Sequence, residues 1–146
     1  MSLNLLAHKQ VDFVKALNAS SEFTRETRWF DGSILIEVDA QQLWLKIYRG
    51  QVIDAMELIP PFGTTISISG STKAWEMLCS GERTFSDLVT AGSRHLKSYD
   101  DPLSEGGGLR PPEIAIGGNG FEAGRIHIAL RDLCSVFASI YRFKAA

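Results

Sequence analysis

The stretch TTISISGSTKAWEMLCSGERTFSDLV, from Thr64 to Val89, passes directly from a strand pattern to two short helix patterns that meet at a glycine. Ile66 and Ile68 alternate with polar residues, which is typical of a β-strand with one buried face. The first helix pattern ends at Gly81 and has two candidate N-cap residues, Ser71 and Thr72. Each helix is too short to be stable in water by itself, so both must pack on an apolar surface.

Both helix patterns are amphipathic. The first presents an apolar stripe made of Ala74, Trp75, Leu78 and Cys79. The second begins with the spacing of a capping box, formed by Thr84 and Asp87. Its apolar positions follow at i, i+3 and i+4, and they are Phe85, Leu88 and Val89. We expect these faces to lie on a sheet, either as filled core or as one wall of an apolar cavity.

Periodicity elsewhere predicts the other elements. Apolar residues at helical spacing run from Leu3 to Asn18 and predict a first helix, which the sequence NASS is expected to end. A second such stripe near the C-terminus consists of Ile126, Leu130, Leu133, Phe137 and Ile140. Alternation with a period of two predicts strands at 34–38, 43–48, 52–58 and 64–69, and a short polar edge strand at 93–99. One polar face in each pattern favours antiparallel pairing. Trp29 and Phe30, beside Asp31 and Gly32, are expected to plug one end of the sheet. The prediction is an α/β (α+β) fold with a mainly antiparallel five-stranded sheet covered by helices.

Composition narrows the class of protein. The 146 residues, 45% apolar and 22% charged, suit one domain over 1–146. A net charge of −2 argues against a nucleic-acid partner. No apolar run approaches the roughly 18 residues of a membrane span, and the N-terminus lacks a secretory leader pattern. Because Cys79 and Cys134 lie in apolar helical surroundings without a C-x-x-C spacing, we expect buried, reduced thiols and a cytoplasmic location.

A Gly- and Pro-rich segment at 100–120, DDPLSEGGGLRPPEIAIGGNG, is long for a connection inside a compact domain. We expect it to be a loop that covers the mouth of the cavity. Its last part resembles a nucleotide-binding glycine motif, but the spacing is G-x-G-x-x-x-G, from Gly118 to Gly124, and no second strand follows to bind a ribose. A nucleotide site is therefore not predicted.

Residues for catalysis are few. The three histidines, His8, His95 and His127, are far apart in the sequence and have no metal-ligand spacing. No serine has the G-x-S-x-G context of a nucleophile. Two acidic groups could hold a cation or act as acid and base, namely Asp100 with Asp101 and Glu113 with Glu122, although solvated loop positions are the simpler interpretation. The sequence predicts no enzyme, no metal and no cofactor.

The order of elements and their apolar positions resemble the sterol carrier protein type 2 domain. That family has an alternating strand, a helix of the form x-x-x-W/F-x-x-L-x-x-G, a second helix, and a glycine that opens the last strand. The matching positions here are Ile66, Ile68, Trp75, Leu78, Gly81, Phe85, Leu88, Val89 and Gly92. The long segment from Asp100 to Gly120 departs from the family pattern, in which the last strand is followed closely by the final helix.

The resemblance implies an α/β sandwich that encloses a tunnel for lipids or other apolar ligands, and it implies binding or transfer without catalytic residues. The ligand-binding residues would be Trp75, Leu78, Phe85, Leu88, Val89, Ile126 and Leu130. The partner would be an apolar small molecule or lipid. An alternative function is a homo-oligomeric assembly module, such as a homodimer, with a filled or vestigial cavity and its apolar helix faces buried against another subunit.

Overall fold

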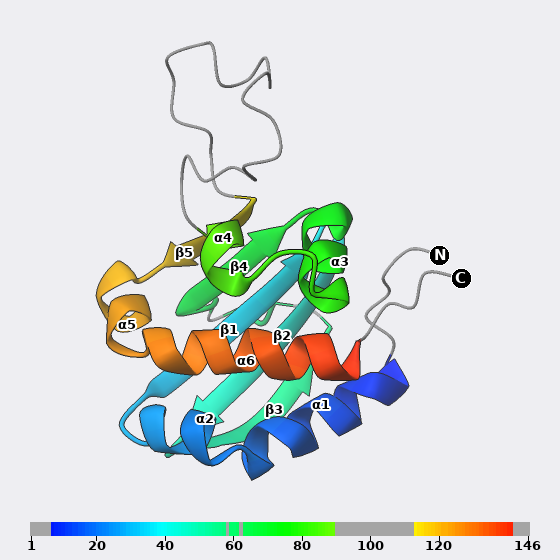
Figure 1. The fold of residues 1–146 in the computed structure, drawn as a ribbon. Helices are drawn as coiled ribbons and strands as arrows, with labels where there is room; N and C mark the ends of the chain where they lie inside the picture. The colour runs from blue at the N-terminus through cyan, green and yellow to red at the C-terminus, as the bar shows by residue number, and fades with distance from the viewer. Residues whose placement is uncertain (1–6, 58, 62, 90–112, 142–146) are drawn as a thin grey trace.

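The computed structural model describes residues 7–57, 59–61, 63–89 and 113–141 (Figure 1). Eleven elements follow one another in this part of the chain. They are α1 (Ala7–Ala19), α2 (Ser21–Glu26), β1 (Asp31–Val38), β2 (Gln41–Tyr48), β3 (Gln51–Met56), β4 (Ile66–Gly70), α3 (Thr72–Ser80), α4 (Phe85–Val89), β5 (Ile114–Gly118), α5 (Gly120–Arg125) and α6 (His127–Ile140).

The sheet has five strands, as expected, in the order β3-β2-β1-β4-β5. It is mixed, because β4 pairs parallel to β1 while the other three pairs are antiparallel. Alternating hydrophobicity shows that one face of a strand is buried, which is commoner in antiparallel sheets, but it does not fix the direction of an individual strand such as β4. The direction of β4 is set by the connection after β3, which returns the chain to the far side of β1 instead of turning back as a hairpin.

The fifth described strand corrects the sequence prediction. Ile114–Gly118 lies inside the segment expected to be a loop, and it pairs with β4 over its whole length. Its two glycines suggested a loop, yet they permit close pairing: a Cβ at Gly118 would collide with the backbone oxygen of Thr65, and one at Gly117 would lie 2.8 Å from the hydroxyl of Ser67. The predicted edge strand at 93–99 and the rest of the loop, 100–112, lie outside the described residues.

A further correction concerns the first connection. The sequence NASS was expected to end the first helix, and α1 does end at Ala19. However, Ser20 then caps a second helix, α2, by accepting a hydrogen bond from the backbone N–H of Phe23. Small polar residues both end and begin helices, so this pattern alone did not distinguish a loop from a new helix.

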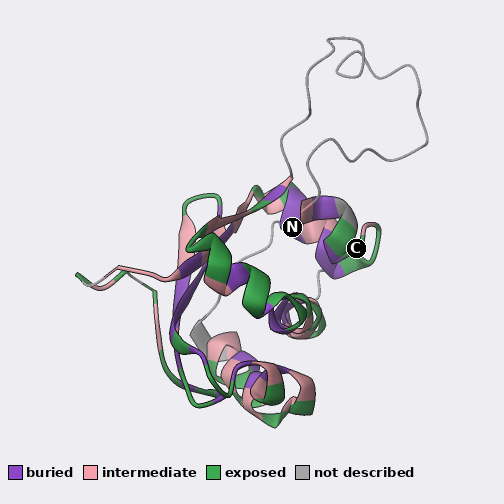
Figure 2. Ribbon diagram, turned by 90° about the vertical axis from the view of Figure 1, so that its left-hand side faces the viewer, coloured by how far each residue is buried: buried purple, intermediate pink, exposed green. Residues whose placement is uncertain are grey.

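The helices lie on one face of the sheet, and α6 runs between α1 and α2 on one side and α3 and α4 on the other (Figures 1 and 2). α6 contacts each of the five other helices. The inner face of the sheet and the facing sides of the helices form one continuous buried cluster, which includes Ile34, Ile36, Leu45, Ile66, Ile68, Leu130, Leu133 and Phe137.

The opposite face of the sheet has its own small buried site. Leu35 and Trp44 are paired across β1 and β2, and both are buried although they lie outside the main cluster. The indole N–H of Trp44 donates to the backbone oxygen of Gly63 at 3.3 Å. The chain before β4 therefore passes over this outer face and shields it from solvent.

The side chain of Asn18 joins the end of α1 to the edge strand β3. Its amide nitrogen donates to the backbone oxygen of Val52 at 3.2 Å, and its oxygen accepts from the backbone N–H of the same residue at 2.7 Å. These two backbone groups face away from β2 at a sheet edge, where they would otherwise have no strand partner. Asn18 thus pairs both of them at once.

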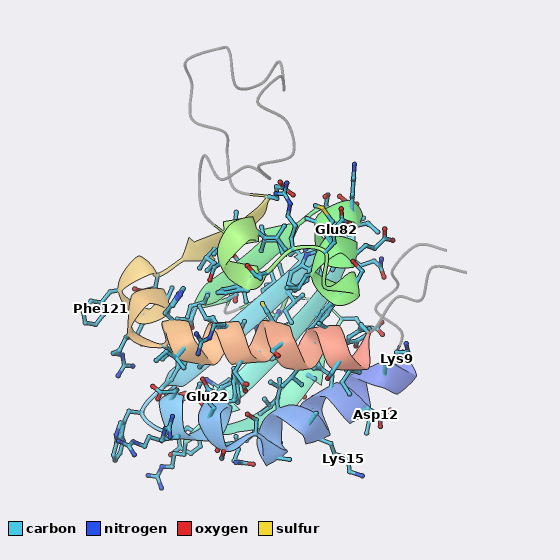
Figure 3. All side chains as sticks on the ribbon, in the orientation of Figure 1. Lys9, Asp12, Lys15, Glu22, Glu82 and Phe121 are labelled. Atoms are coloured by element: carbon cyan, nitrogen blue, oxygen red, sulfur yellow. The ribbon has the colours of Figure 1, made fainter. Side chains whose placement is uncertain are left out.

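We predict that Asn18→Ala lowers the free energy of unfolding by about 1–3 kcal/mol, because both backbone groups of Val52 lose their partner. Chemical denaturation would measure the loss. Lys15→Ala is the control, since Lys15 is exposed on the same helix (Figure 3) and should change stability by no more than about 0.5 kcal/mol. Equal effects of the two substitutions would contradict the proposed role of Asn18.

Asp39 links the turn after β1 to the start of α3. It has a φ of 51° and accepts hydrogen bonds from the backbone N–H and the hydroxyl of Thr72, at 2.8 and 2.7 Å. The hydroxyl bond first, and then the backbone bond, lower the pKa of Asp39 below its usual value of 3.8. The stabilisation of the folded state by these two bonds is therefore fully present above the unfolded-state pKa of 3.8. It is lost as the pH falls through the lower pKa that Asp39 has in the folded state.

Asp39→Asn should remove the contribution of this residue to the loss of stability at low pH. Asparagine tolerates the same backbone conformation but does not titrate. The measurement is the difference in urea midpoint between pH 7 and about pH 2.5, for the wild type and the variant. We expect a smaller difference in Asp39→Asn. An unchanged difference would mean that the bonds to Thr72 do not stabilise the ionised carboxylate.

Candidate functional site

The ends of α3 are built as the sequence predicts. The hydroxyl of Ser71 accepts from the backbone N–H of Ala74 at 3.1 Å, and Gly81, with a φ of 79°, is the C-cap that follows Ser80. α4 then begins directly after Thr84. A salt bridge of 2.7 Å between Arg83 and Glu113 attaches this turn to the start of β5. Both side chains are largely buried, so the contact holds the two helices against the sheet.

The residues predicted to bind ligand come together in space. Six of them are buried in the main cluster, namely Trp75, Leu78, Phe85, Leu88, Ile126 and Leu130. Val89 is half-buried and packs against the same cluster. Three elements, α3, α4 and α6, supply most of these side chains, and the apolar inner face of the sheet lies opposite them. The structure thus places the whole predicted set in one apolar layer.

Aromatic rings close this layer at the C-terminal end of α6. Phe137 stacks on Tyr141 with ring centroids 4.5 Å apart, and it contacts Trp75 at 4.8 Å and Phe13 at 5.7 Å. The indole N–H of Trp75 also donates to the backbone oxygen of Glu37 at 2.9 Å. We call these four residues, Phe13, Trp75, Phe137 and Tyr141, the aromatic cluster.

Two polar atoms beside the aromatic cluster are buried without a hydrogen-bond partner. They are the hydroxyl of Tyr141 and the side-chain nitrogen of Gln10. Burial, and then the negative charge of Glu57, raise the pKa of Tyr141 to about 12, so the phenol keeps its proton at neutral pH. Neither residue was predicted from the sequence. The available signal was the position of Tyr141 four residues after Phe137, on the same face of the helical pattern.

The candidates for catalysis are engaged in structural contacts. Glu113 pairs with Arg83, and Glu122 pairs with Arg125 at 2.6 Å, so these two glutamates do not form an acid–base pair. Asp100 and Asp101 lie outside the described residues. Among the histidines only the side chain of His127 is described; it is exposed, with its ring 5.8 Å from that of Phe85. In the described part of the chain, no three His, Cys, Asp or Glu residues are grouped to hold a metal ion.

Both cysteines are free and buried, as expected. Burial, followed by the charge of Glu76, raises the pKa of Cys79 to about 11, and burial raises the pKa of Cys134 further above its usual value. Since the thiolate is the nucleophilic form of cysteine, these protonated thiols are poor nucleophiles at neutral pH.

Two aromatic side chains, Trp29 and Phe121, are far more exposed than the other aromatic residues in the described part of the chain. Trp29 was expected to plug the end of the sheet, but 77% of it is exposed, and only its neighbour Phe30 is buried. Phe121 on α5 is also 77% exposed and points away from the body of the molecule (Figure 3). Arg125 connects them, because it lies one turn after Phe121 and donates to the backbone oxygen of Trp29 at 3.3 Å.

No described helix has the length and apolar character that crossing a bilayer requires. Comparison with family models gives no match, and no curated protein has a significantly similar sequence.

Solved structures do match. A crystal structure of sterol carrier protein 2 is similar with a TM-score of 0.58 and 15% identity, and the alignment covers 91% of this chain and 96% of that one. The solution structure of a conserved hypothetical protein from Thermus thermophilus, described as a possible sterol carrier protein, is similar with a TM-score of 0.61 and 12% identity, over 98% and 94% of the two chains. The chain therefore has a fold like that of sterol carrier protein 2.

Proposed function

We propose that the protein binds, or carries between sites, a lipid-like or other apolar small molecule, without catalysing a reaction. The ligand lies between the sheet and the helices α3, α4 and α6, against Trp75, Leu78, Phe85, Leu88, Val89, Ile126 and Leu130. The observation that carries this proposal is the assembly of all seven side chains in one apolar layer. The likeness of the fold to a protein named as a sterol carrier supports it.

The construction of α3 and α4 suits a wall that moves aside for a ligand. These helices have nine and five residues, so their stability depends on packing and not on their own length. Gly81 provides a hinge between them, and a Cβ added there would meet no neighbour within 4 Å. Besides packing, the Arg83–Glu113 salt bridge and the bonds from Thr72 to Asp39 hold this pair of helices. Parts of a fold with few such restraints open at a lower free-energy cost than the whole fold does.

The chemistry of the layer also favours binding over catalysis. The thiols of Cys79 and Cys134 are held in their protonated form, and Glu113 is neutralised by Arg83. An apolar ligand gains about 25 cal/mol for each Å² of apolar surface that leaves water, so such a layer can bind by the hydrophobic effect alone.

The three tryptophans report on three separate places. Trp75 lies in the apolar layer, Trp44 lies on the opposite face of the sheet, and Trp29 is exposed. Methyl laurate does not absorb light in the wavelength range of tryptophan absorption and emission. We predict that it shifts the tryptophan emission of the wild type, and that Trp75→Phe removes most of this shift. The fluorescence titration should give a saturable signal with one site per chain.

Trp44→Phe is the matched control and should keep the ligand-induced shift. Trp75→Phe removes the bond to Glu37 and should cost about 1–3 kcal/mol of stability, so circular dichroism must first establish that the variant is folded. A shift that survives in Trp75→Phe but disappears in Trp44→Phe would place the ligand elsewhere. No shift in any of the proteins, together with no binding by a second method, would contradict the proposed function.

The exposed pair Trp29 and Phe121 favours a second candidate function, a homo-oligomeric assembly module. The apolar face of α6 is buried inside the chain, since Leu130, Leu133 and Phe137 have no exposed surface. A contact between subunits would therefore use other residues, and large exposed aromatic side chains are common in interfaces. Arg125 donates to the backbone oxygen of Trp29 and pairs with Glu122 in its own chain, so its charge is already compensated and the contact between subunits would be mainly apolar.

If this surface joins two copies, Trp29→Ser combined with Phe121→Ser should convert a dimer into monomers in sedimentation velocity experiments without lowering the melting temperature. Val11→Ser is a suitable control, because Val11 is another exposed apolar residue on a different helix. A wild-type protein that sediments as a monomer at high concentration would rule out this candidate.

A further inference from the structure

Unpaired buried polar groups are rare in folded proteins, and each one calls for an explanation. In the described part of the chain, the buried side-chain atoms without a partner are the Tyr141 hydroxyl and the Gln10 nitrogen. Only 2% of Tyr141 is exposed. The ring of Tyr141 packs against Phe137, which in turn contacts Trp75 of the ligand layer proposed above.

Gln10 is in the first turn of α1 and Tyr141 directly follows α6, and these two helix ends lie side by side (Figure 1). The ring of Tyr141 packs against Phe13 of α1 at 5.8 Å. The ammonium of Lys9, which Figure 3 labels at the start of α1, lies 6.0 Å from the centre of the same ring. Gln10 is one turn before Phe13 on α1, so it lies on the face of that helix that packs against α6.

The chemistry of the two groups is complementary to one kind of ligand atom. The amide nitrogen of glutamine can only donate, and the protonated phenol can also donate. Two donors beside an apolar layer fit an acceptor oxygen with two lone pairs. The surrounding rings of Phe13, Phe137 and Trp75 provide apolar surface for a hydrocarbon chain that continues from this oxygen.

The charges at this corner favour an uncharged oxygen over a carboxylate. Lys9 is half-buried and sits over the ring face of Tyr141, not at its hydroxyl. The two donors, a phenol and an amide, are both uncharged, and both atoms are buried. A carboxylate bound to them would be taken out of water without a cationic partner at the donors, which is unfavourable.

We propose that the Tyr141 hydroxyl and the Gln10 amide bind the carbonyl oxygen of an uncharged acyl ligand, such as a fatty-acid ester, whose chain lies along the aromatic cluster. This inference rests on the proposed function and adds to it a ligand class and two specificity-determining residues. The two donors remain unpaired when the site is empty. They distinguish acyl compounds from plain hydrocarbons, which bind by burial of apolar surface alone.

The test compares ligands with hydrocarbon chains of similar length that end in an ester, a carboxyl group or a plain methyl group. Methyl laurate, lauric acid and tridecane compete with diphenylhexatriene, an uncharged probe that fluoresces in apolar surroundings, for binding to the wild type. We expect methyl laurate to bind about tenfold more tightly than tridecane, which corresponds to one net hydrogen bond or slightly more. Lauric acid at about pH 8, where its carboxyl is ionised, should bind more weakly than its methyl ester.

The variants are Tyr141→Phe and Gln10→Leu, with Tyr48→Phe as the control because it removes a half-exposed hydroxyl elsewhere. Each of the first two should lose most of the preference for methyl laurate and keep the wild-type affinity for tridecane. In the empty protein, Tyr141→Phe should leave the melting temperature unchanged or raise it, since it removes an unpaired buried hydroxyl. Tyr48→Phe should change none of these values.

Three results would overturn the inference. Equal affinity of the wild type for methyl laurate and tridecane would show that an apolar ligand binds but that the two donors do not contribute to its binding. A lower melting temperature of empty Tyr141→Phe would show that the hydroxyl already has a partner. If diphenylhexatriene and all three competitors fail to bind the wild type, the proposed function fails and this inference fails with it.

Discussion

Phe137 makes the contacts on which the helical layer depends. Its ring touches Phe13 of α1, Trp75 of α3 and Tyr141 beyond α6, so one side chain joins segments from the beginning, the middle and the end of the chain. Aromatic rings of this kind each bury about 150–250 Å². α6 carries Phe137 and contacts the five other helices. The position of the helical layer on the sheet therefore depends mainly on the packing of α6.

The same arrangement distinguishes two parts of the apolar layer. At the N-terminal end of α6, Phe85 of α4 contacts His127, and the turn between α3 and α4 is attached to β5 by the Arg83–Glu113 salt bridge. At the C-terminal end, the aromatic cluster includes Trp75 of α3 and contains the unpaired hydroxyl of Tyr141. The two ends therefore differ in chemistry: the first is apolar with one salt bridge, and the second has two donors without a partner.

The sequence predicted the elements with strong local signals. Ser71 and Gly81 delimit α3 as expected, because caps depend on a few neighbouring residues. The apolar stripe of α6 and the burial of Trp75 were also predicted correctly. These features follow from side-chain spacing alone, and they include the inner wall of the candidate site.

Features that depend on contacts between distant residues were not predictable in the same way. β5 was mistaken for a loop because its glycines are required by close approach to Thr65 and Ser67, which only the fold brings near. The parallel pairing of β4 depends on the path of the chain and not on its own sequence. Trp29 was assigned to the interior by its hydrophobicity, but its position in the turn before β1 leaves it in solvent. Likewise, no local pattern marks Gln10 as an unpaired donor.

The central claim is that the layer between the sheet and the helices takes an apolar ligand. Native mass spectrometry of the freshly purified full chain tests it most directly. The account predicts a non-covalent adduct of one small molecule per chain that organic solvent removes and that methyl laurate restores. A spectrum with only the bare chain, both as purified and after incubation with excess methyl laurate, would contradict it.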